Sequence, residues 1–206
     1  MTAKLPEAIR KLSEELAELP SIGPRQALRL AFYIVNRGTN YIKGLSLNVD
    51  NLRQIKICER CFFVHQNKDS LCDICKNPTR KQNFIILVEK ETDLISVENT
   101  GKFGGRYFIL GAIPKTGLLE DWQKLRLKSL EGFISKAPPI GLGGKAEEII
   151  LALNPTSVGD FHASLLLKEL QPFTKKISRL GRGLPTGGEI EFADDETLGG
   201  ALENRN

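Results

Sequence analysis

The sequence predicts a mixed α/β fold with an N-terminal helical hairpin, a four-cysteine segment, a parallel α/β domain and a short C-terminal segment. Three observations support this order. Apolar residues recur at helical spacing near the start, four cysteines follow as two Cys-x2-Cys pairs, and the remaining chain alternates short apolar runs with helical patterns. We place these parts at residues 1–54, 55–80, 81–175 and 176–206.

The composition is typical of a globular protein in water. Of 206 residues, 41% are hydrophobic and 26% are charged, which excludes a fibrous or disordered chain. The longest strongly apolar run, Phe84 to Val88, is too short to cross a bilayer, and no secretory signal pattern is visible. We therefore expect a cytosolic protein that does not bind membranes.

Positive charge is concentrated in the first part of the chain. The formal net charge is +4. Residues 1–80 contain 13 basic and 8 acidic side chains, whereas residues 81–206 contain 16 basic and 17 acidic ones. This division suggests a basic module joined to a nearly neutral one, and a basic module is compatible with a nucleic-acid partner.

The N-terminal region predicts three helices. An apolar stripe with alternating spacings of four and three residues marks the first, which Pro20 ends: Leu5, Ile9, Leu12, Leu16 and Leu19. Pro24 suits the first position of a second helix, and Gly38 ends it. A third helix is expected from Tyr41 to Ile55.

The turn between the first two helices has the form of a helix-hairpin-helix motif, from Leu19 to Leu28. A short hairpin containing Gly23 exposes main-chain N–H groups at the start of the second helix, where a DNA phosphate can bind. Arg25 and Arg29, one turn apart, add positive charge along the same track. Such binding is independent of base sequence and sensitive to salt. The alternative is an ordinary helical hairpin with solvated arginines.

The four cysteines predict a structural metal site. Cys58, Cys61, Cys72 and Cys75 form two Cys-x2-Cys turns, and two such turns together make a closed tetrahedral site that favours Zn2+. We therefore expect one structural zinc ion per chain. Two disulfides and a redox pair are the alternatives. His65 lies between the turns and is interpreted as a loop histidine rather than a ligand.

The remainder predicts alternating strands and helices, and hence a mainly parallel sheet. The expected strands are Phe84–Val88, Gly105–Leu110 and Ile149–Leu153, and the expected helices run near Thr92–Asn99, Trp122–Ile134 and Phe161–Leu170.

The order of these parts resembles the RecR family of recombination mediator proteins. Beyond the hairpin and the cysteines, the stretches that carry the resemblance are Ile86–Glu89, Gly105–Leu110, Ile149–Thr156, Gly183–Glu189 and Thr197–Leu198. Together they cover most of the chain in the family's order.

The resemblance implies a Toprim domain at residues 81–175 and a non-enzymatic role in recombinational DNA repair. RecR-like proteins bind single- and double-stranded DNA without sequence preference and assemble into dimers or tetrameric rings. They act with RecO and RecF to load the RecA recombinase onto single-stranded DNA. By the same resemblance, residues 176–206 are expected to take part in oligomerisation, and the location is the bacterial cytosol near the nucleoid.

Toprim enzymes hold Mg2+ with a glutamate after one strand and an Asp-x-Asp pair after a later one. Glu89 occupies the first position, but Asn154 and Thr156 stand in the second, so no catalysis is expected. The alternative is a Mg2+-dependent Toprim nuclease or primase-like enzyme. Glu89 is either a solvated or capping acid at the strand end or a partner-binding residue. Asp160, which remains where the family has an acidic pair, is a candidate partner-binding residue.

Overall fold

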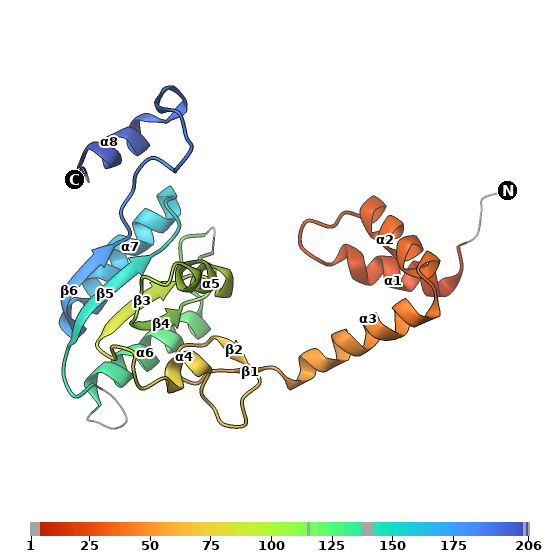
Figure 1. The fold of residues 1–206 in the computed structure, drawn as a ribbon, viewed down its shortest axis with the longest axis horizontal. Helices are drawn as coiled ribbons and strands as arrows, with labels where there is room; N and C mark the ends of the chain where they lie inside the picture. Colours follow the sequence, from red (N-terminus) through yellow and green to blue (C-terminus); the bar gives the residue numbers. More distant parts are fainter. Residues whose placement is uncertain (1–4, 115, 137–141, 204, 206) are drawn as a thin grey trace. The chain divides into compact units, whose positions relative to one another are not determined.

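The computed structural model describes residues 5–114, 116–136, 142–203 and 205. The chain divides into two compact units, residues 1–55 and residues 56–206. The described part of the first unit is helical, and the second contains the sheet (Figure 1). The mixed α/β fold class predicted from the sequence is confirmed.

The described part of the first unit is a helical hairpin followed by a third helix and a short 3-10 helix. Its described elements are α1 (Glu7–Ala17), α2 (Pro24–Asn36), α3 (Thr39–Asn51) and the short 3-10 helix η1 (Leu52–Gln54). Helix α1 contacts α2, where Ala27 and Ala31 are fully buried and their small side chains allow a close approach. Gly38 separates α2 from α3 with a φ of 84°, a conformation that glycine adopts without strain. The three predicted helices are confirmed.

The second unit is built on a parallel sheet of four described strands. In spatial order these are β4 (Arg106–Ile109), β3 (Phe84–Val88), β5 (Ala146–Ala152) and β6 (Thr174–Arg179). Helix α5 (Glu91–Asn99) connects β3 to β4, α6 (Asp121–Ser135) connects β4 to β5, and α7 (Ser157–Leu170) with η2 (Gln171–Phe173) connects β5 to β6. The predicted strands and helices of this region are confirmed.

Helices cover both faces of the sheet, which explains the continuous apolar runs in its central strands. On one face, Ile85 and Leu87 pack with residues of α6 and α7 such as Leu127 and Leu166. On the other face, the alternate residues of β3 pack with Leu94 of α5. Residues one position apart therefore belong to different cores, as the pleat of a strand requires.

Strand β6 is an element that sequence analysis missed. It carries the sheet past residue 175, the expected end of the Toprim domain, and into the segment expected at residues 176–206. An edge strand is open to solvent, and β6 exposes Lys175 and Lys176 there. Cations are common on edge strands because they prevent pairing with another sheet. Because these lysines interrupt β6, it lacks the continuous apolar run by which the central strands were predicted.

The cysteine segment and the C-terminus add short elements to this unit. The first contains the antiparallel pair β1 (Lys56–Ile57) and β2 (Val64–His65) and the helix α4 (Asp73–Lys76). The second contains η3 (Ile190–Phe192) and α8 (Asp195–Glu203). Among the described residues, no helix combines the length and apolar character needed to span a membrane.

Candidate functional site

The start of α2 presents the features expected of a phosphate-binding hairpin. Gly23 is the residue that precedes the helix, Pro24 occupies its first turn, and no side chain caps the main-chain N–H groups there. The first intrahelical bond is donated by Ala27 to the carbonyl of Gly23 at 3.0 Å, so the preceding N–H groups point out of the helix. Arg25 and Arg29 are both exposed on α2. The three predicted residues therefore lie together at one accessible helix end.

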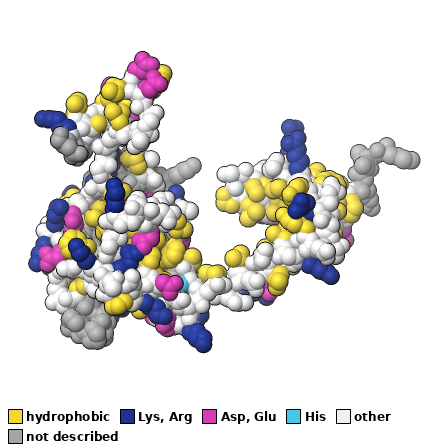
Figure 2. Space-filling view, in the orientation of Figure 1, with side chains coloured by type: hydrophobic (Ala, Val, Ile, Leu, Met, Phe, Trp, Pro, Cys, Tyr) yellow, Lys and Arg dark blue, Asp and Glu magenta, His cyan; other side chains and the backbone are white. Residues whose placement is uncertain are grey.

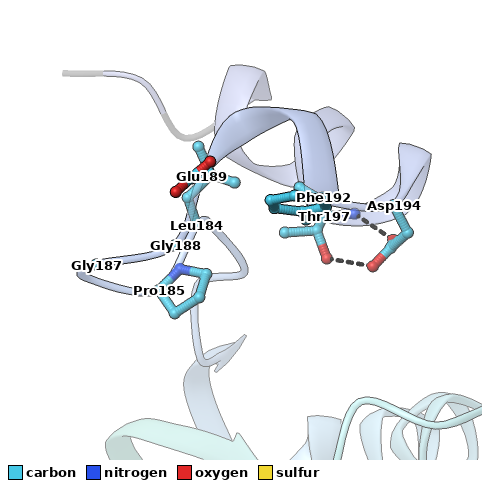
Figure 3. A pocket seen from close by; sticks show the side chains of 9 residues that line it. Leu184, Pro185, Gly187, Gly188, Glu189, Phe192, Asp194 and Thr197 are labelled. Carbon is cyan, nitrogen blue, oxygen red and sulfur yellow. Dashed lines mark hydrogen bonds between the residues drawn. The ribbon is translucent and has the colours of Figure 1, made fainter.

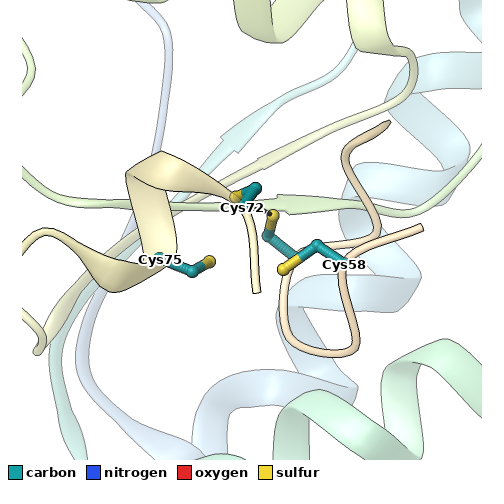
Figure 4. Close-up of side chains that lie close together, drawn as sticks. Cys58, Cys72 and Cys75 are labelled. Atoms are coloured by element: carbon teal, nitrogen blue, oxygen red, sulfur yellow. Dashed lines mark hydrogen bonds between the residues drawn. The ribbon is translucent and has the colours of Figure 1, made fainter. Parts of the chain in front are cut away.

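The four cysteines meet in one buried cluster, with Cys58 and Cys61 on the first turn and Cys72 and Cys75 at α4 (Figure 4). Their sulfur atoms all lie within 4.8 Å of one another, and the Sγ atoms of Cys61 and Cys72 are 3.4 Å apart. All four are free thiols rather than disulfides. Four convergent sulfurs at these separations fit a tetrahedral metal site with no open coordination position. The cluster can therefore hold a metal ion as a structural element.

Contacts within the cluster shift the pKa values of two of its thiols in opposite directions. Hydrogen bonding from the thiols of Cys61, Cys72 and Cys75 lowers the pKa of Cys58, and hydrogen bonding to Cys58 raises the pKa of Cys61. Arg106 of β4 is 4% exposed, and its guanidinium lies 5.2 Å from the ring centroid of Phe133. Burial and the charge of a nearby arginine lower the pKa of Arg106, whereas negative charge on the cysteines raises it. Arg106 thus lies within the electrostatic range of the cluster.

The cysteine cluster is bonded to β4, an edge strand of the sheet. The main-chain N–H of Ile109 in β4 donates to the carbonyl of Cys61 at 3.0 Å. Phe62 adopts a left-handed conformation with a φ of 64°, and its ring contacts that of Phe108 edge to face at 5.5 Å. The cysteine segment therefore belongs structurally with the sheet, and order in the cluster is coupled to order at β4.

His65 is not part of the group of side chains that could hold a metal ion. It is 8% exposed, and its Nδ1 accepts a hydrogen bond from the main-chain N–H of Asn67 at 3.1 Å. The Nε2 atom has no hydrogen-bond partner among the described residues. His65 lies in strand β2 rather than in a loop, and it is outside the group of four potential metal ligands.

A second feature lies at the carboxyl ends of β3 and β5, the neighbouring central strands. The chain leaves β3 for β4 on one side and returns to form β5 on the other, so this is the switch point where α/β sheets place ligands. A cavity of about 480 Å3 is located there. Its lining residues are Glu89, Ile113, Asn154, Pro155, Thr156, Val158 and Gly159.

The carboxylate of Glu89 is hydrogen-bonded to the main chain of another residue that lines this cavity. It is 6% exposed, and its Oε1 accepts a hydrogen bond from the N–H of Asn154 at 2.7 Å. This hydrogen bond agrees with the interpretation of Glu89 as a capping acid. The structure holds no partner chain, so the interpretation as a partner-binding residue stays a prediction. Asn154 and Thr156 contribute no carboxylate, so among the described residues Glu89 is the sole acidic one that lines the cavity.

Gly159 allows the loop after β5 to lie against α7. The hydroxyl of Thr156 accepts a hydrogen bond from the N–H of Gly159 at 3.1 Å and begins the helix. A Cβ atom at Gly159 would lie 2.0 Å from the carbonyl oxygen of Asn154. Only glycine fits this approach, which was not recognised from the sequence.

Asp160 lies outside the residues that line the cavity and participates in a network of ion pairs. Its carboxylate pairs with Arg179 at the end of β6 and with Arg182, and Arg182 also pairs with Glu196 of α8. The hydrogen bond from Arg179, reinforced by the charge of Arg182, holds the pKa of Asp160 below its ordinary value. Glu89 and Asp160, both predicted as partner-binding residues, therefore have different surroundings.

Comparison with known families identifies three parts of the chain. Residues 9–51 match the family model described as RecR, helix-hairpin-helix, residues 83–181 match the Toprim domain, and residues 183–206 match RecR, C-terminal. A protein of Chloroflexus aggregans named Recombination protein RecR is 38% identical over 200 residues, covering 96% of this chain and 92% of its own. The chain belongs to the RecR family. RecR proteins of Dehalococcoides mccartyi and Frankia alni are 38% and 34% identical over 96% of this chain, and 93% and 95% of their own lengths are covered.

In this RecR chain the C-terminal segment forms a pocket of its own, with a volume of about 460 Å3 (Figure 3). Asp194 accepts hydrogen bonds from the main-chain N–H and the hydroxyl of Thr197, both at 2.8 Å, and so begins α8. Ile190 is 67% exposed and Phe192 is 79% exposed. This short segment therefore exposes two large apolar side chains to solvent.

Proposed function

We propose that this RecR-family chain is a non-enzymatic, DNA-binding recombination mediator in recombinational DNA repair. In this role it acts with RecO and RecF to load the RecA recombinase onto single-stranded DNA. It binds single- and double-stranded DNA without sequence preference, because its contacts are made to phosphates. The role implies a location in the bacterial cytosol, in association with the nucleoid.

The observation that carries the proposal is the uncapped start of α2. Gly23 precedes it, and Arg25 and Arg29 are exposed on its surface. Main-chain N–H groups, the positive end of the helix dipole and two guanidinium groups are all suited to a phosphate. None of these groups reads a base edge, which is why the affinity depends on charge rather than on sequence.

The absence of catalysis is proposed from the cavity beside β3 and β5. A Toprim enzyme needs several carboxylates to hold Mg2+ next to a phosphate. Here Glu89 is the carboxylate in the lining, and it is bonded to the N–H of Asn154. Asp160 is proposed to contact partner proteins through the charged network. Glu89, which is buried, is proposed to support partner binding by ordering the loop after β5.

The metal is proposed to be a single structural Zn2+ ion per chain, held by Cys58, Cys61, Cys72 and Cys75. Soft thiolate ligands in a buried, closed tetrahedron favour zinc over Mg2+ or Ca2+. When bound, the ion cross-links two turns of a segment that has little apolar core of its own. Its effect on DNA binding is therefore indirect, through the order of the cysteine segment.

A homo-oligomer, as a dimer or a tetrameric ring, completes the proposal. The exposed apolar residues of the C-terminal segment, including Ile190 and Phe192, support a role for residues 176–206 in assembly. A ring also explains how a chain with few cationic contacts retains DNA. Mass measurement on the native protein, with and without DNA, tests the oligomeric state.

The decisive experiment measures the affinity of the full chain for DNA over a series of salt concentrations. Arg25→Ala with Arg29→Ala is expected to weaken binding to single and double strands and to reduce the salt slope by about two. Lys11→Ala, which removes an exposed charge from α1, is the control. Unchanged affinity in the double variant would reject this helix end as the binding site, and no binding at low salt would reject the mediator role.

The second candidate is a Mg2+-dependent Toprim nuclease or primase-like enzyme, which the cavity beside Glu89 favours. Cleavage or synthesis of DNA that requires Mg2+ and is abolished by Glu89→Gln would establish it. The mediator proposal predicts no such reaction in the wild-type protein or in the Glu89→Gln variant.

A further inference from the structure

Beyond Arg29, the exposed row along α2 continues with an aromatic ring and a further cation. Residues 25, 29, 33 and 37 follow one another at intervals of four, and are Arg25, Arg29, Tyr33 and Arg37. All four are exposed. Positions four apart form a ridge along a helix surface, with successive residues about 6 Å apart along the axis. Figure 2 shows basic and hydrophobic side chains exposed together over these N-terminal helices.

Tyr41 at the start of α3 extends this row. Its ring lies edge to face with that of Tyr33, with centroids 6.2 Å apart and planes at 85°. The guanidinium carbon of Arg37 lies 6.0 Å from the Tyr33 centroid and 5.1 Å from the Tyr41 centroid. The two tyrosines remain 52% and 36% exposed. The cluster therefore orders its rings while leaving part of each available to a ligand.

We propose that Tyr33, Arg37 and Tyr41 form a stacking site for the unpaired bases of a DNA strand whose phosphates lie on Arg25 and Arg29. The inference rests on the proposed DNA binding and specifies its ligand as single-stranded DNA. Aromatic rings and guanidinium planes stack on any base, so this site requires no particular sequence. A duplex keeps its bases inside and can use only the phosphate-binding part of the row.

The alternative is that the cluster only connects α2 to α3, whose described residues include no buried side chain. Both interpretations predict that the tyrosine rings pack on Arg37. They differ in whether the rings contribute to the affinity for bases. A ligand with phosphates but without bases therefore separates them.

The test compares a thymidine strand with an abasic strand of equal length, using fluorescence anisotropy at low salt and the full chain. The wild-type protein is expected to bind the base-bearing strand about tenfold more tightly, which is the effect of about one stacked base. Tyr33→Leu with Tyr41→Leu is expected to remove that tenfold difference. Tyr33→Phe with Tyr41→Phe keeps the rings and is expected to retain it.

Two further variants distinguish the possible failures. Arg25→Ala with Arg29→Ala is expected to weaken binding to both strands by the same factor. Arg53→Ala, which removes an exposed charge near the other end of α3, is expected to leave the ratio unchanged. Equal wild-type affinity for the two strands, or a ratio that survives in the folded leucine variant, overturns the stacking site. Absence of binding to either strand overturns the proposed DNA binding itself.

If the leucine variant loses helical structure by circular dichroism, the phenylalanine variant still decides the question. A phenylalanine variant that folds and has lost the tenfold ratio overturns the proposal, because its rings are in place.

Discussion

The carboxylate of Glu89 accepts a hydrogen bond from the main-chain N–H of Asn154 at 2.7 Å, although 65 residues separate the two in the chain. The bond joins the ends of β3 and β5 at the point where Toprim enzymes place their metal. At the position where Toprim enzymes use a carboxylate to bind Mg2+, the Glu89 carboxylate of this chain is bonded to the main chain of the loop after β5. This relationship supports the proposal that the Toprim domain of this chain is not catalytic.

Replacement of Glu89 is expected to destabilise the fold. Glu89→Ala removes the buried carboxylate that accepts the hydrogen bond from the Asn154 N–H and should lower the free energy of unfolding by about 2 kcal/mol. Glu89→Gln keeps an acceptor oxygen and should cost less. Urea denaturation measures both. Glu147→Ala, which breaks an ion pair with Lys175, is the control and should cost less than about 1 kcal/mol. Equal costs for the two alanine variants would mean that the cap contributes nothing beyond a surface contact.

Two glycines on neighbouring helices should respond to alanine in opposite directions. At Gly159 the new Cβ would meet the Asn154 carbonyl oxygen at 2.0 Å, so Gly159→Ala should destabilise the protein by about 2 kcal/mol. At Gly132 in α6 nothing lies within 4 Å, and Gly132→Ala should stabilise it by up to about 1 kcal/mol because alanine favours helix. Thermal denaturation of both variants measures the difference. Two shifts of the same sign would contradict the packing described for the loop after β5.

The ion pairs of Asp160 should make a pH-dependent contribution to stability. Because its pKa is lowered in the folded protein by Arg179 and Arg182, the contribution is present above the unfolded value of about 3.9 and is lost as pH falls through the folded pKa. The Asp160 side chain is 37% exposed, so Asp160→Asn should cost less than about 1 kcal/mol at pH 6. The difference between wild type and variant should shrink toward pH 3. Asp121→Asn, whose side chain is 95% exposed, should show no comparable trend in urea denaturation.

Removal of the metal should unfold the cysteine segment. Cys58→Ser or Cys75→Ser is expected to abolish binding of the proposed zinc ion and to lower the thermal midpoint, because a buried cluster loses its cross-link. His65→Ala should retain the metal, since the site is complete with four sulfurs. Elemental analysis of the native protein gives the metal content. Loss of zinc in the histidine variant would show that the ligand set includes His65.

Arg106 should slow the loss of the metal by offsetting the charge of the thiolates. It is buried, and its Nε and Nη1 atoms have no hydrogen-bond partner among the described residues. Arg106→Met keeps much of the volume without the charge and should increase the rate of metal transfer to a chelator by about tenfold. Arg53→Met, at a side chain that is 84% exposed, is the control. Equal transfer rates in the two variants would contradict a role for the buried charge.

Sequence alone determined the local features of this chain. The spacing of the cysteines, the proline at the start of α2 and the apolar run of β3 each act within a few residues, so their consequences can be read without knowing the fold. Gly23, Arg25 and Arg29 were predicted as DNA-binding residues for the same reason. They are close in the sequence, so the start of a single helix is enough to bring them together.

Only the tertiary structure decided the features that join distant segments. The edge position of β6 explains why its lysines did not signal a strand, and the contact of Gly159 with Asn154 depends on how a loop meets a helix. The bond from Asn154 to Glu89 and the pairs of Asp160 depend on which strand ends are neighbours. Neighbouring strands are chosen by the packing of the whole sheet, whose order β4-β3-β5-β6 is not the order of the chain. A carboxylate can therefore be located from sequence, but its partner is set by the fold.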